Sequence, residues 1–362
     1  MSAGMLSRNS GALRLAVGQL QRRPSVSVVI PCYNYARYLP EAVASALEQT
    51  EVDVDVVIVD DASTDGSGQL ALELASADPR IQPILHAENM GHIATYNDGL
   101  SRAAGEYVVL LSADDLLAPG SLARSTALME NHPEVGLVYG YAEEFSETVP
   151  PSSGKRASWS LWRGEEWIGI MCRRGSNIIM NPEAVLRRTV MEQLSGYRTD
   201  MPHAADMDLW LRAAAISGVG RVNGPVQAYY RVHGQNMHLT DFSATLDDIR
   251  ARREVFDEFC TVSGPALTRP RQFLHAARKA LAIEAVRAAI HLADVDGGQP
   301  GHSSALADFA SQTDSTITTS PLWASYLRRS SGNSSMAERT FSEFVYRWRW
   351  SLQWRRWRRS GI

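Results

Sequence analysis

Short apolar runs rich in β-branched residues alternate with longer stretches of helical periodicity through the first part of this chain. The apolar runs are residues 26–30, 54–59, 81–85, 108–111 and 135–139. The stretches between them, at residues 36–48, 67–77, 93–103 and 121–131, have the length and pattern of helices. Strands alternating with such helices indicate βαβ units, so we expect an α/β fold whose mostly parallel sheet carries helices on both faces.

Polar clusters follow three of the first four predicted strands. They read PCYN after the first strand, DDASTDGS after the second and SADD after the fourth. In open α/β sheets, ligands bind outside the carboxyl ends of the strands. The coincidence of three polar clusters at these ends predicts a functional site at one edge of the sheet.

The cluster after the second strand has two interpretations. Its Asp, Ser, Thr and Gly residues form a turn that exposes backbone N–H groups at a helix start, which favours anions. Asp60 or Asp61 could instead cap the helix that follows, because Asp is a preferred N-cap residue. Neither the G-x-G-x-x-G pattern nor a Walker A loop is present, so the usual NAD and ATP signatures are missing.

Asp114 and Asp115, directly after a buried strand, also leave two alternatives open. Mg²⁺ or Mn²⁺ binds one or two carboxylates and takes its other ligands from water and substrate phosphates. Such an ion would neutralise charge on a departing nucleoside diphosphate. In the other interpretation, Asp115 caps the helix that begins near Pro119, and Asp114 is solvated.

Charge and cysteine content exclude several classes of protein. Four arginines lie within residues 1–24 and six within residues 345–362, so the body between them is acidic, which argues against nucleic-acid binding. The three cysteines have no metal-type spacing and suggest reduced thiols in a cytoplasmic setting. No apolar stretch is long enough for a transmembrane helix, and the N-terminal residues lack the apolar core of a secretory signal.

Four sequence blocks together resemble a family 2 glycosyltransferase with the GT-A fold. They are VSVVIPCYNYARYLPEAVASALEQT, VDVVIVDDASTDGS, AENMGHIATYNDGLSRAAGEYVVLLSADDLLAPGSL and AADMDLWLR, in that order. The resemblance covers residues 25–235. It implies the inverting transfer of a sugar from a nucleotide-sugar donor to an acceptor hydroxyl, with Mg²⁺ or Mn²⁺ as cofactor.

Carried over residue by residue, the resemblance implies a donor site at the strand ends. Pro31 and Tyr33 would line the nucleoside pocket, and Asp61 would hydrogen-bond the base edge. The ribose and diphosphate would be contacted by Ser112, Ala113 and Asp114. Asp114 would be the metal ligand of the family's D-x-D signature. Ser112 replaces the first Asp of that signature, which removes a charge.

The resemblance places the acceptor chemistry on Asp206, within AADMDLWLR. An inverting transfer needs one base to take the proton from the attacking hydroxyl. The family commonly has Glu before this Asp, where this chain has Ala205. Asp206 could instead be an N-cap after Pro202. Asp208 and Arg212 are spaced to pair with each other on the helix.

His233 falls where many GT-A enzymes supply a histidine to the metal or the diphosphate. Imidazole is a capable metal ligand, although a lone histidine is more often an ordinary structural residue. His203 and His238 are weaker candidates for the same role.

The resemblance and the composition together suggest how the chain is organised. We expect a basic flexible N-terminal segment at 1–24 and a GT-A domain at 25–240, with a nucleotide-binding half at 25–145 and an acceptor half at 146–240. A helical extension at 241–335 follows, because residues 241–260 and 269–293 show helical periodicity. Within it, residues 297–335 are rich in Gly, Ser and Thr and are expected to be loop-like or only loosely helical.

The tail, residues 336–362, is rich in arginine and tryptophan. On a helical wheel Tyr346, Trp350, Trp354 and Trp357 share one face, with arginines largely opposite. This pattern is typical of a helix lying on an anionic membrane surface. The alternative is a helix that docks its tryptophans on the protein while its arginines meet acidic residues. The first interpretation predicts a cytoplasmic protein attached to the cytoplasmic face of a membrane.

We therefore expect a glycosyltransferase that acts on a glycan or lipid-linked acceptor in cell-surface or secreted glycan assembly. Ser112 and Ala205 motivate one alternative, a catalytically degenerate nucleotide-sugar or glycan-binding module. A nucleotidyltransferase is a second alternative, but its Gly-rich, basic first loop is missing from IPCYNYARYL. A structural scaffold built on the helical C-terminal part is a third and weaker one.

Overall fold

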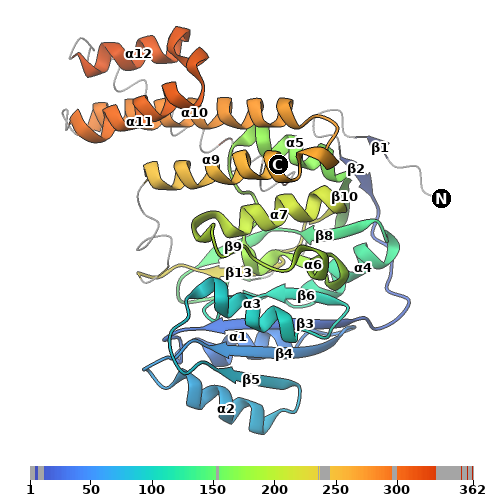
Figure 1. Cartoon of the computed structure of the whole chain (residues 1–362). Helices are drawn as coiled ribbons and strands as arrows, with labels where there is room; N and C mark the ends of the chain where they lie inside the picture. The colour runs from blue at the N-terminus through green and yellow to red at the C-terminus, as the bar shows by residue number, and fades with distance from the viewer. Residues whose placement is uncertain are drawn as a thin grey trace. The chain divides into compact units, whose positions relative to one another are not determined.

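The computed structural model describes residues 5–6, 12–151, 155–234, 236, 245–295, 300–331, 352, 357 and 361 (Figure 1). These residues form two compact units. The first draws on Met1–Trp167, Ile178–Asn236 and Gly361, and the second on Ile168–Asn177 and Met237–Ser360. Helix α5 (Gly164–Arg174) begins in the first unit and ends in the second.

The first unit is built on a mixed sheet. Within the described residues its strand order is β1 (Met5–Leu6), β2 (Leu13–Leu15), β10 (Ser158–Trp162), β12 (Gly218–Asn223), β8 (Val135–Tyr139), β11 (Val185–Arg187), β6 (Tyr107–Leu110), β3 (Ser25–Cys32), β4 (Asp53–Asp60) and β5 (Ile81–Leu85). Strands β6, β3, β4 and β5 are parallel, as expected from the βαβ pattern. Strands β8 and β12 also pair in parallel, whereas β11, β10 and β2 join in antiparallel orientation.

Seven helices of the first unit follow the strands in the described residues. They are α1 (Leu39–Leu47), α2 (Ser67–Ala77), α3 (His92–Arg102), α4 (Ser121–Asn131), α6 (Arg188–Leu194), α7 (Ala205–Ile216) and the beginning of α5. Two short 3₁₀ turns, η1 (Asn181–Glu183) and η2 (Pro202–Ala204), lie between them. A small second sheet contains β7 (Leu116–Leu117), β13 (Ala228–Arg231) and β9 (Ala142–Phe145).

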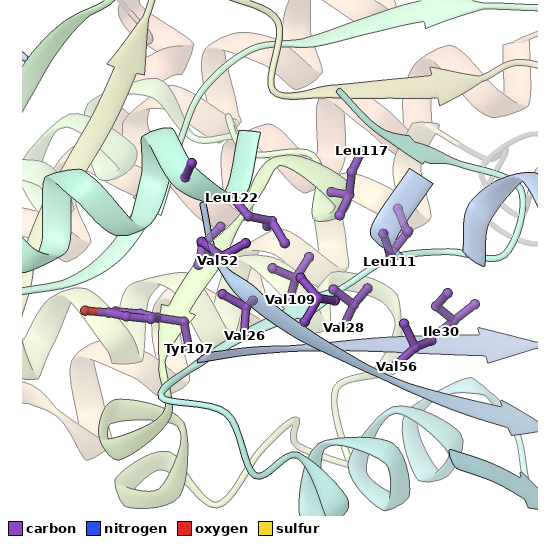
Figure 2. Close-up of a cluster of buried hydrophobic side chains, with 14 of the residues drawn as sticks. Val26, Val28, Ile30, Val52, Val56, Tyr107, Val109, Leu111, Leu117 and Leu122 are labelled. Carbon is purple, nitrogen blue, oxygen red and sulfur yellow. The ribbon is translucent and has the colours of Figure 1, made fainter. Parts of the chain in front are cut away.

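Side chains alternate across the parallel strands, so each strand contributes to two apolar layers. One layer contains Val26, Val28 and Ile30 of β3, which pack with β4, β6, α1 and α4 (Figure 2). On the other face α3 approaches closely at Gly99, where a Cβ atom would lie 2.3 Å from Val29 Cγ1. The helices therefore cover both faces of this part of the sheet, as the sequence predicted.

The N-terminal residues correct one prediction. We expected a basic flexible segment over residues 1–24, but Leu13–Leu15 form strand β2, which pairs with β10. Leu13 and Leu15 pack against the core with Arg14 between them, a two-residue alternation typical of a strand. Further along, Arg22 forms ion pairs with Glu106 and Glu130. The basic composition had concealed this short apolar alternation.

The second unit is helical. It contains α9 (Thr245–Val262), η3 (Gly264–Ala266), α10 (Pro270–Val295), α11 (Pro300–Thr313), η4 (Ser315–Thr319) and α12 (Pro321–Ser330). Helix α10 packs against α9, α11 and α12. Buried Arg252 of α9 pairs with Asp248 and with Glu284 of α10, and it donates to the Gly175 carbonyl oxygen.

Helices α11 and α12 are regular, whereas we expected residues 297–335 to be loop-like or only loosely helical. Leu306, Phe309 and Ala310 of α11 are buried at helical spacing, so tertiary packing outweighs the weak helix propensity of the neighbouring serines. Ser320 caps α12 by accepting a hydrogen bond from Trp323 N at 3.1 Å, and Pro321 occupies the first turn.

No helix in the described part of the chain combines the length and apolar character needed to cross a bilayer. The three cysteines are buried free thiols. Most of the Arg/Trp-rich tail lies outside the described residues, as does His238. Of the tail only Leu352, Trp357 and Gly361 are described, and the Trp357 side chain is buried.

Candidate active site

The predicted donor-binding residues lie at the carboxyl ends of three neighbouring parallel strands. Pro31 is the penultimate residue of β3 and pairs in register with Val59 of β4, and Asp61 follows β4 directly. The Leu111 N–H donates to the Val29 carbonyl oxygen, which aligns the end of β6 with β3. The three polar clusters therefore meet at one edge of the sheet. Tyr33 is 48% exposed there.

None of the helix-cap alternatives for the site aspartates is correct. The N-cap residues of α2, α4 and α7 are Gly66, Gly120 and Ala204, and none has a side-chain cap hydrogen bond. Asp206 lies inside the first turn of α7 instead. Asp114 is 5% exposed, so it is not a solvated surface residue.

Asp61 is buried and surrounded by hydrogen-bond donors. Its Oδ1 accepts from Met90 N and lies 2.8 Å from His86 Nδ1, and its Oδ2 accepts from Gly91 N at 3.0 Å. Burial alone would raise its pKa, but these hydrogen bonds hold the pKa of Asp61 below its ordinary value. Asp61 therefore ties β4 to the loop that leads into α3.

Asp114 and His233 come together from distant parts of the chain. His233 Nε2 lies 2.9 Å from Asp114 Oδ2, and the Tyr35 hydroxyl also hydrogen-bonds Asp114. The imidazole stacks on Tyr38 with ring centroids 5.3 Å apart. The structure thus assembles the two side chains that the sequence proposed as metal ligands.

Arg231 holds the backbone around this pair. Its Nε donates to the Asp114 carbonyl oxygen at 2.8 Å, and its backbone N–H donates to Asp115 Oδ1 at 2.9 Å. Its guanidinium also pairs with Glu41 at 2.6 Å and lies over the Tyr38 ring. Burial and the neighbouring Asp114 charge raise the pKa of Asp115 well above its ordinary range.

Ser112 and Ala113 lie on the strand-to-loop turn beside Asp114. The Ser112 carbonyl oxygen accepts a hydrogen bond from Asp115 N at 3.0 Å, which closes the turn. Ala113 is buried, whereas Ser112 keeps part of its surface exposed. Ser112 thus lies on the same turn as Asp114, two residues before it.

Asp206 lies in a polar contact with two residues that the sequence had not indicated. Asn181 Nδ2 donates to Asp206 Oδ1 at 3.1 Å, and the Tyr197 hydroxyl also hydrogen-bonds Asp206. Asp206 keeps some exposed surface, but burial among protein atoms raises its pKa to about 6 against the opposing effect of the two hydrogen bonds. A carboxylate with this pKa is ionised at neutral pH and still basic enough to accept a proton.

The negative charges of Asp206 and Asp114 both affect the pKa values of Tyr96 and Tyr230. Burial raises the pKa of Tyr96, and the negative charges of Asp206 and Asp114 raise it further. Burial also raises the pKa of Tyr230, with further contributions from Asp115, Asp114 and Asp206. The η1 turn, whose Asn181 bonds Asp206, contacts β6 and β7 on either side of Asp114, so the two carboxylates belong to one region. The hydrogen bonds of Asp61 instead lead toward the start of α3.

Several residues of this region carried no sequence signal of their own. Asn181 and Tyr197 belong to a segment without a recognised motif, and Arg231 precedes His233 by two residues without any spacing rule to mark it. Tyr35 lies inside the PCYNYARY block, so its position beside the strand end was the one available indication. The Asp208–Arg212 ion pair is confirmed, at 2.7 Å.

Comparison with known proteins identifies the family. The family model described as glycosyl transferase family 2 matches residues 27–194. An uncharacterized glycosyltransferase of Nostoc sp. is 32% identical over 230 residues, which cover 61% of this chain and 68% of that protein. The chain belongs to glycosyltransferase family 2. A second relative, an uncharacterized glycosyltransferase of Haemophilus influenzae, is 26% identical over 221 residues, covering 59% of this chain and 68% of that protein.

The solved structures agree with a glycosyltransferase fold. The crystal structure of S. aureus TarS 1–349 in complex with UDP-GlcNAc superposes with a TM-score of 0.62. The match has 16% sequence identity and covers 89% of this chain and 91% of that one. It confirms the GT-A type α/β architecture with its helical C-terminal part, which was the fold class expected from the sequence.

Proposed function

We propose that this glycosyltransferase transfers a sugar, with inversion, from a nucleotide-sugar donor to an acceptor hydroxyl, and that Asp206 is the catalytic base. The observation that carries the proposal is that Asp206 bonds Asn181 of η1, and that η1 contacts β6 and β7, the strands on either side of Asp114. One carboxylate can thus serve the donor diphosphate while the other serves the acceptor of the same reaction.

The donor is proposed to lie across the ends of β3, β4 and β6. Pro31 and exposed Tyr33 would face its nucleoside, and Ser112, Ala113 and Asp114 its ribose and diphosphate. The TarS structure, which contains UDP-GlcNAc, supports a nucleotide-sugar donor for a chain of this fold. Asp61 is proposed to contact the base edge, although its two oxygens already accept protein hydrogen bonds.

A divalent cation fits this site only as a partial shell. Among the described residues no group of three or more His, Cys, Asp or Glu side chains is arranged to hold a metal ion. Asp114 and His233 provide one carboxylate and one imidazole side by side. Mg²⁺ and Mn²⁺ sites that are completed by water and substrate phosphates need no more than this from the protein. When bound, the ion would neutralise charge on the departing diphosphate.

The protein's own residues would then accept the proton and orient the reacting groups. Asp206 takes the proton from the acceptor hydroxyl as its oxygen bonds to the anomeric carbon. The bond from that carbon to the diphosphate breaks, and the diphosphate leaves with the electron pair. Attack from the face opposite the leaving group inverts the anomeric configuration.

For the acceptor and the cellular location of the reaction we propose only a general class. A glycan or lipid-linked acceptor in cell-surface or secreted glycan assembly, used on the cytoplasmic side of a membrane, is consistent with the family. Attachment of the tail to an anionic membrane remains part of this proposal. Trp357 is buried and the Tyr139 hydroxyl donates to the Gly361 carbonyl oxygen at 2.9 Å, which favours the docking alternative for these two residues.

The proposal is tested by screening the purified full chain against a panel of nucleotide sugars with Mg²⁺ or Mn²⁺. Thermal shifts identify the donor, and release of nucleoside diphosphate with or without an acceptor reports chemistry. We expect one donor to be bound and turned over in a reaction that chelation abolishes. Binding without any turnover would instead favour the degenerate sugar-nucleotide-binding module suggested by Ser112 and Ala205.

A further inference from the structure

The surroundings of Asp206 contain a hydrogen-bonded relay that ends on its carboxylate. Asn181 donates its amide N–H to Asp206 Oδ1 at 3.1 Å and accepts at Oδ1 from the Tyr197 hydroxyl at 3.2 Å. The Tyr197 hydroxyl also hydrogen-bonds Asp206, so its single proton is shared between Asn181 Oδ1 and the carboxylate. The three side chains thus bond one another, and the Asn181 amide has a defined orientation within the group.

Both side chains that bond Asp206 are themselves anchored by other parts of the protein. The Tyr197 backbone is held at its N–H and its carbonyl by the side chain of Asn97, at 2.8 and 2.9 Å. The Tyr197 ring is 3% exposed and packs against Tyr96. Because Asn97 and Tyr96 belong to α3, this helix positions Tyr197 relative to the acceptor-side carboxylate.

Asn181 is anchored independently, by the 3₁₀ turn η1. Its carbonyl oxygen accepts from Ala184 N at 3.1 Å. Glu183, two residues on, is buried and accepts from Met180 N at 3.1 Å. Pro182 between them restricts the backbone further. A side chain held in this way loses little additional freedom when it orients a neighbour.

We propose that Asn181 and Tyr197 are positioning residues, which orient the Asp206 carboxylate toward the acceptor and keep it ionised during turnover. The inference rests on the proposed role of Asp206 as the base. Hydrogen bonds that donate to a carboxylate favour its charged form, so loss of either donor makes Asp206 harder to ionise. The variants should then lose activity chiefly at low pH.

Other titratable groups surround Asp206, and the two variants are chosen so that the effect of Asp206 on the pH profile can be distinguished from theirs. The Asp206 charge raises the pKa values of the phenols Tyr96, Tyr197 and Tyr230, and the Asp114 charge also raises those of Tyr96 and Tyr230. His203 lies in the η2 turn before α7, and His92 of α3 contacts that turn. Asp208, on the same helix as Asp206, pairs with Arg212. Asn181→Asp replaces none of these titratable groups. Tyr197→Phe removes one of them, but a phenol is uncharged at neutral pH, so this variant leaves the net charge around Asp206 unchanged.

The test is the pH profile of kcat/KM for the wild type, Asn181→Asp and Tyr197→Phe. Asn181→Asp keeps size and shape but replaces the donor with an acidic acceptor. We expect its acidic limb to move up by at least about one pH unit, so that activity falls at least about fivefold at pH 6 and recovers near pH 9. Tyr197→Phe should shift the limb in the same direction by a smaller amount.

Asn131→Asp is a matched control, because it adds the same charge on α4, where Asn131 bonds backbone carbonyls of Gln19 and Ala127. Its profile should superpose on the wild type. A uniform loss of activity at every pH in both site variants, or an unshifted limb, overturns the positioning role. Asp206→Asn, measured alongside, tests the base itself: if it is inactive while the limbs do not move, the proposed function stands and this inference falls.

Discussion

His233 Nε2 lies 2.9 Å from Asp114 Oδ2, although the two residues are 119 positions apart in the chain. The contact joins the end of β6 to the segment after β13, and Arg231 locks both backbones around it. This carboxylate and imidazole are the two side chains that we propose as ligands of a divalent cation. This contact is the basis of the metal prediction below.

We predict that transfer requires a divalent cation and that both side chains contribute to its affinity. His233→Ala should raise the Mn²⁺ or Mg²⁺ concentration for half-maximal activity at least about tenfold, because one ligand is lost. Asp114→Asn should have a larger effect, since it also removes the charge. Metal titrations after chelation measure both. Wild-type activity that survives exhaustive chelation would contradict the metal role.

We predict that Asp206→Asn stabilises the folded protein at neutral and higher pH. Burial raises the folded-state pKa of Asp206 from 3.8 to about 6, so the folded protein holds this proton more tightly than the unfolded chain does. Ionisation of Asp206 therefore lowers the free energy of unfolding, and this destabilising effect is absent below about pH 4 and complete above about pH 6.

The expected gain in the free energy of unfolding is about 1–3 kcal/mol at pH 8, and it should shrink toward zero near pH 4. Denaturant titrations of the wild type and Asp206→Asn at both pH values measure it. An equal difference at the two pH values would show that ionisation of Asp206 is not its cause.

Asp61 is predicted to stabilise the fold even when no donor is present. Asp61→Asn loses a charged acceptor that serves His86 and the N–H groups of Met90 and Gly91, so unfolding should become easier by about 1–3 kcal/mol. Asp98→Asn is the matched control, because Asp98 contacts the other ring nitrogen of His86, at 3.3 Å, and otherwise pairs only weakly with Arg102, at 3.9 Å. If Asp61→Asn leaves the melting temperature unchanged and weakens only donor binding, Asp61 acts solely on the base edge.

Gly99→Ala tests the close approach of α3 to the sheet. In a free helix this substitution gains about 1 kcal/mol. Here the new Cβ atom would lie 2.3 Å from Val29 Cγ1 and 2.9 Å from Val59 Cγ2, so overpacking should outweigh the gain and destabilise the protein by about 1–3 kcal/mol. Gly301→Ala in α11, with no heavy atom within 4 Å, should be neutral or stabilising. Equal melting temperatures for the two variants would contradict this packing.

The core of the first unit could be predicted from the sequence because local pattern and tertiary environment agree there. The expected helices at 67–77 and 121–131 coincide with α2 and α4, since apolar periodicity follows directly after Gly66 and Gly120. Residues 300–313 were expected to be loop-like or only loosely helical, because their serines weaken the local signal. Packing against α10 explains the regular helix α11.

The site could be predicted in part, for the same physical reason. Asp61, Asp114 and Asp206 stand beside recognisable strand ends or motifs, and the sequence identifies them. Asn181 and Tyr197 act through contacts that form only when distant segments fold together, so no spacing rule could indicate them. Their assigned roles stay predictions until the variants are measured.

Transfer by Asp206→Asn is the most direct test of the proposed mechanism. Loss of a general base costs about 10²–10⁴-fold in rate, so kcat should fall by at least about 100-fold while the Kd of the nucleotide sugar stays near the wild-type value. Asp208→Asn, two residues along the same helix but paired with Arg212, is the control and should retain transfer. Asp206→Asn that transfers sugar at the wild-type rate would contradict the assignment of Asp206 as the base.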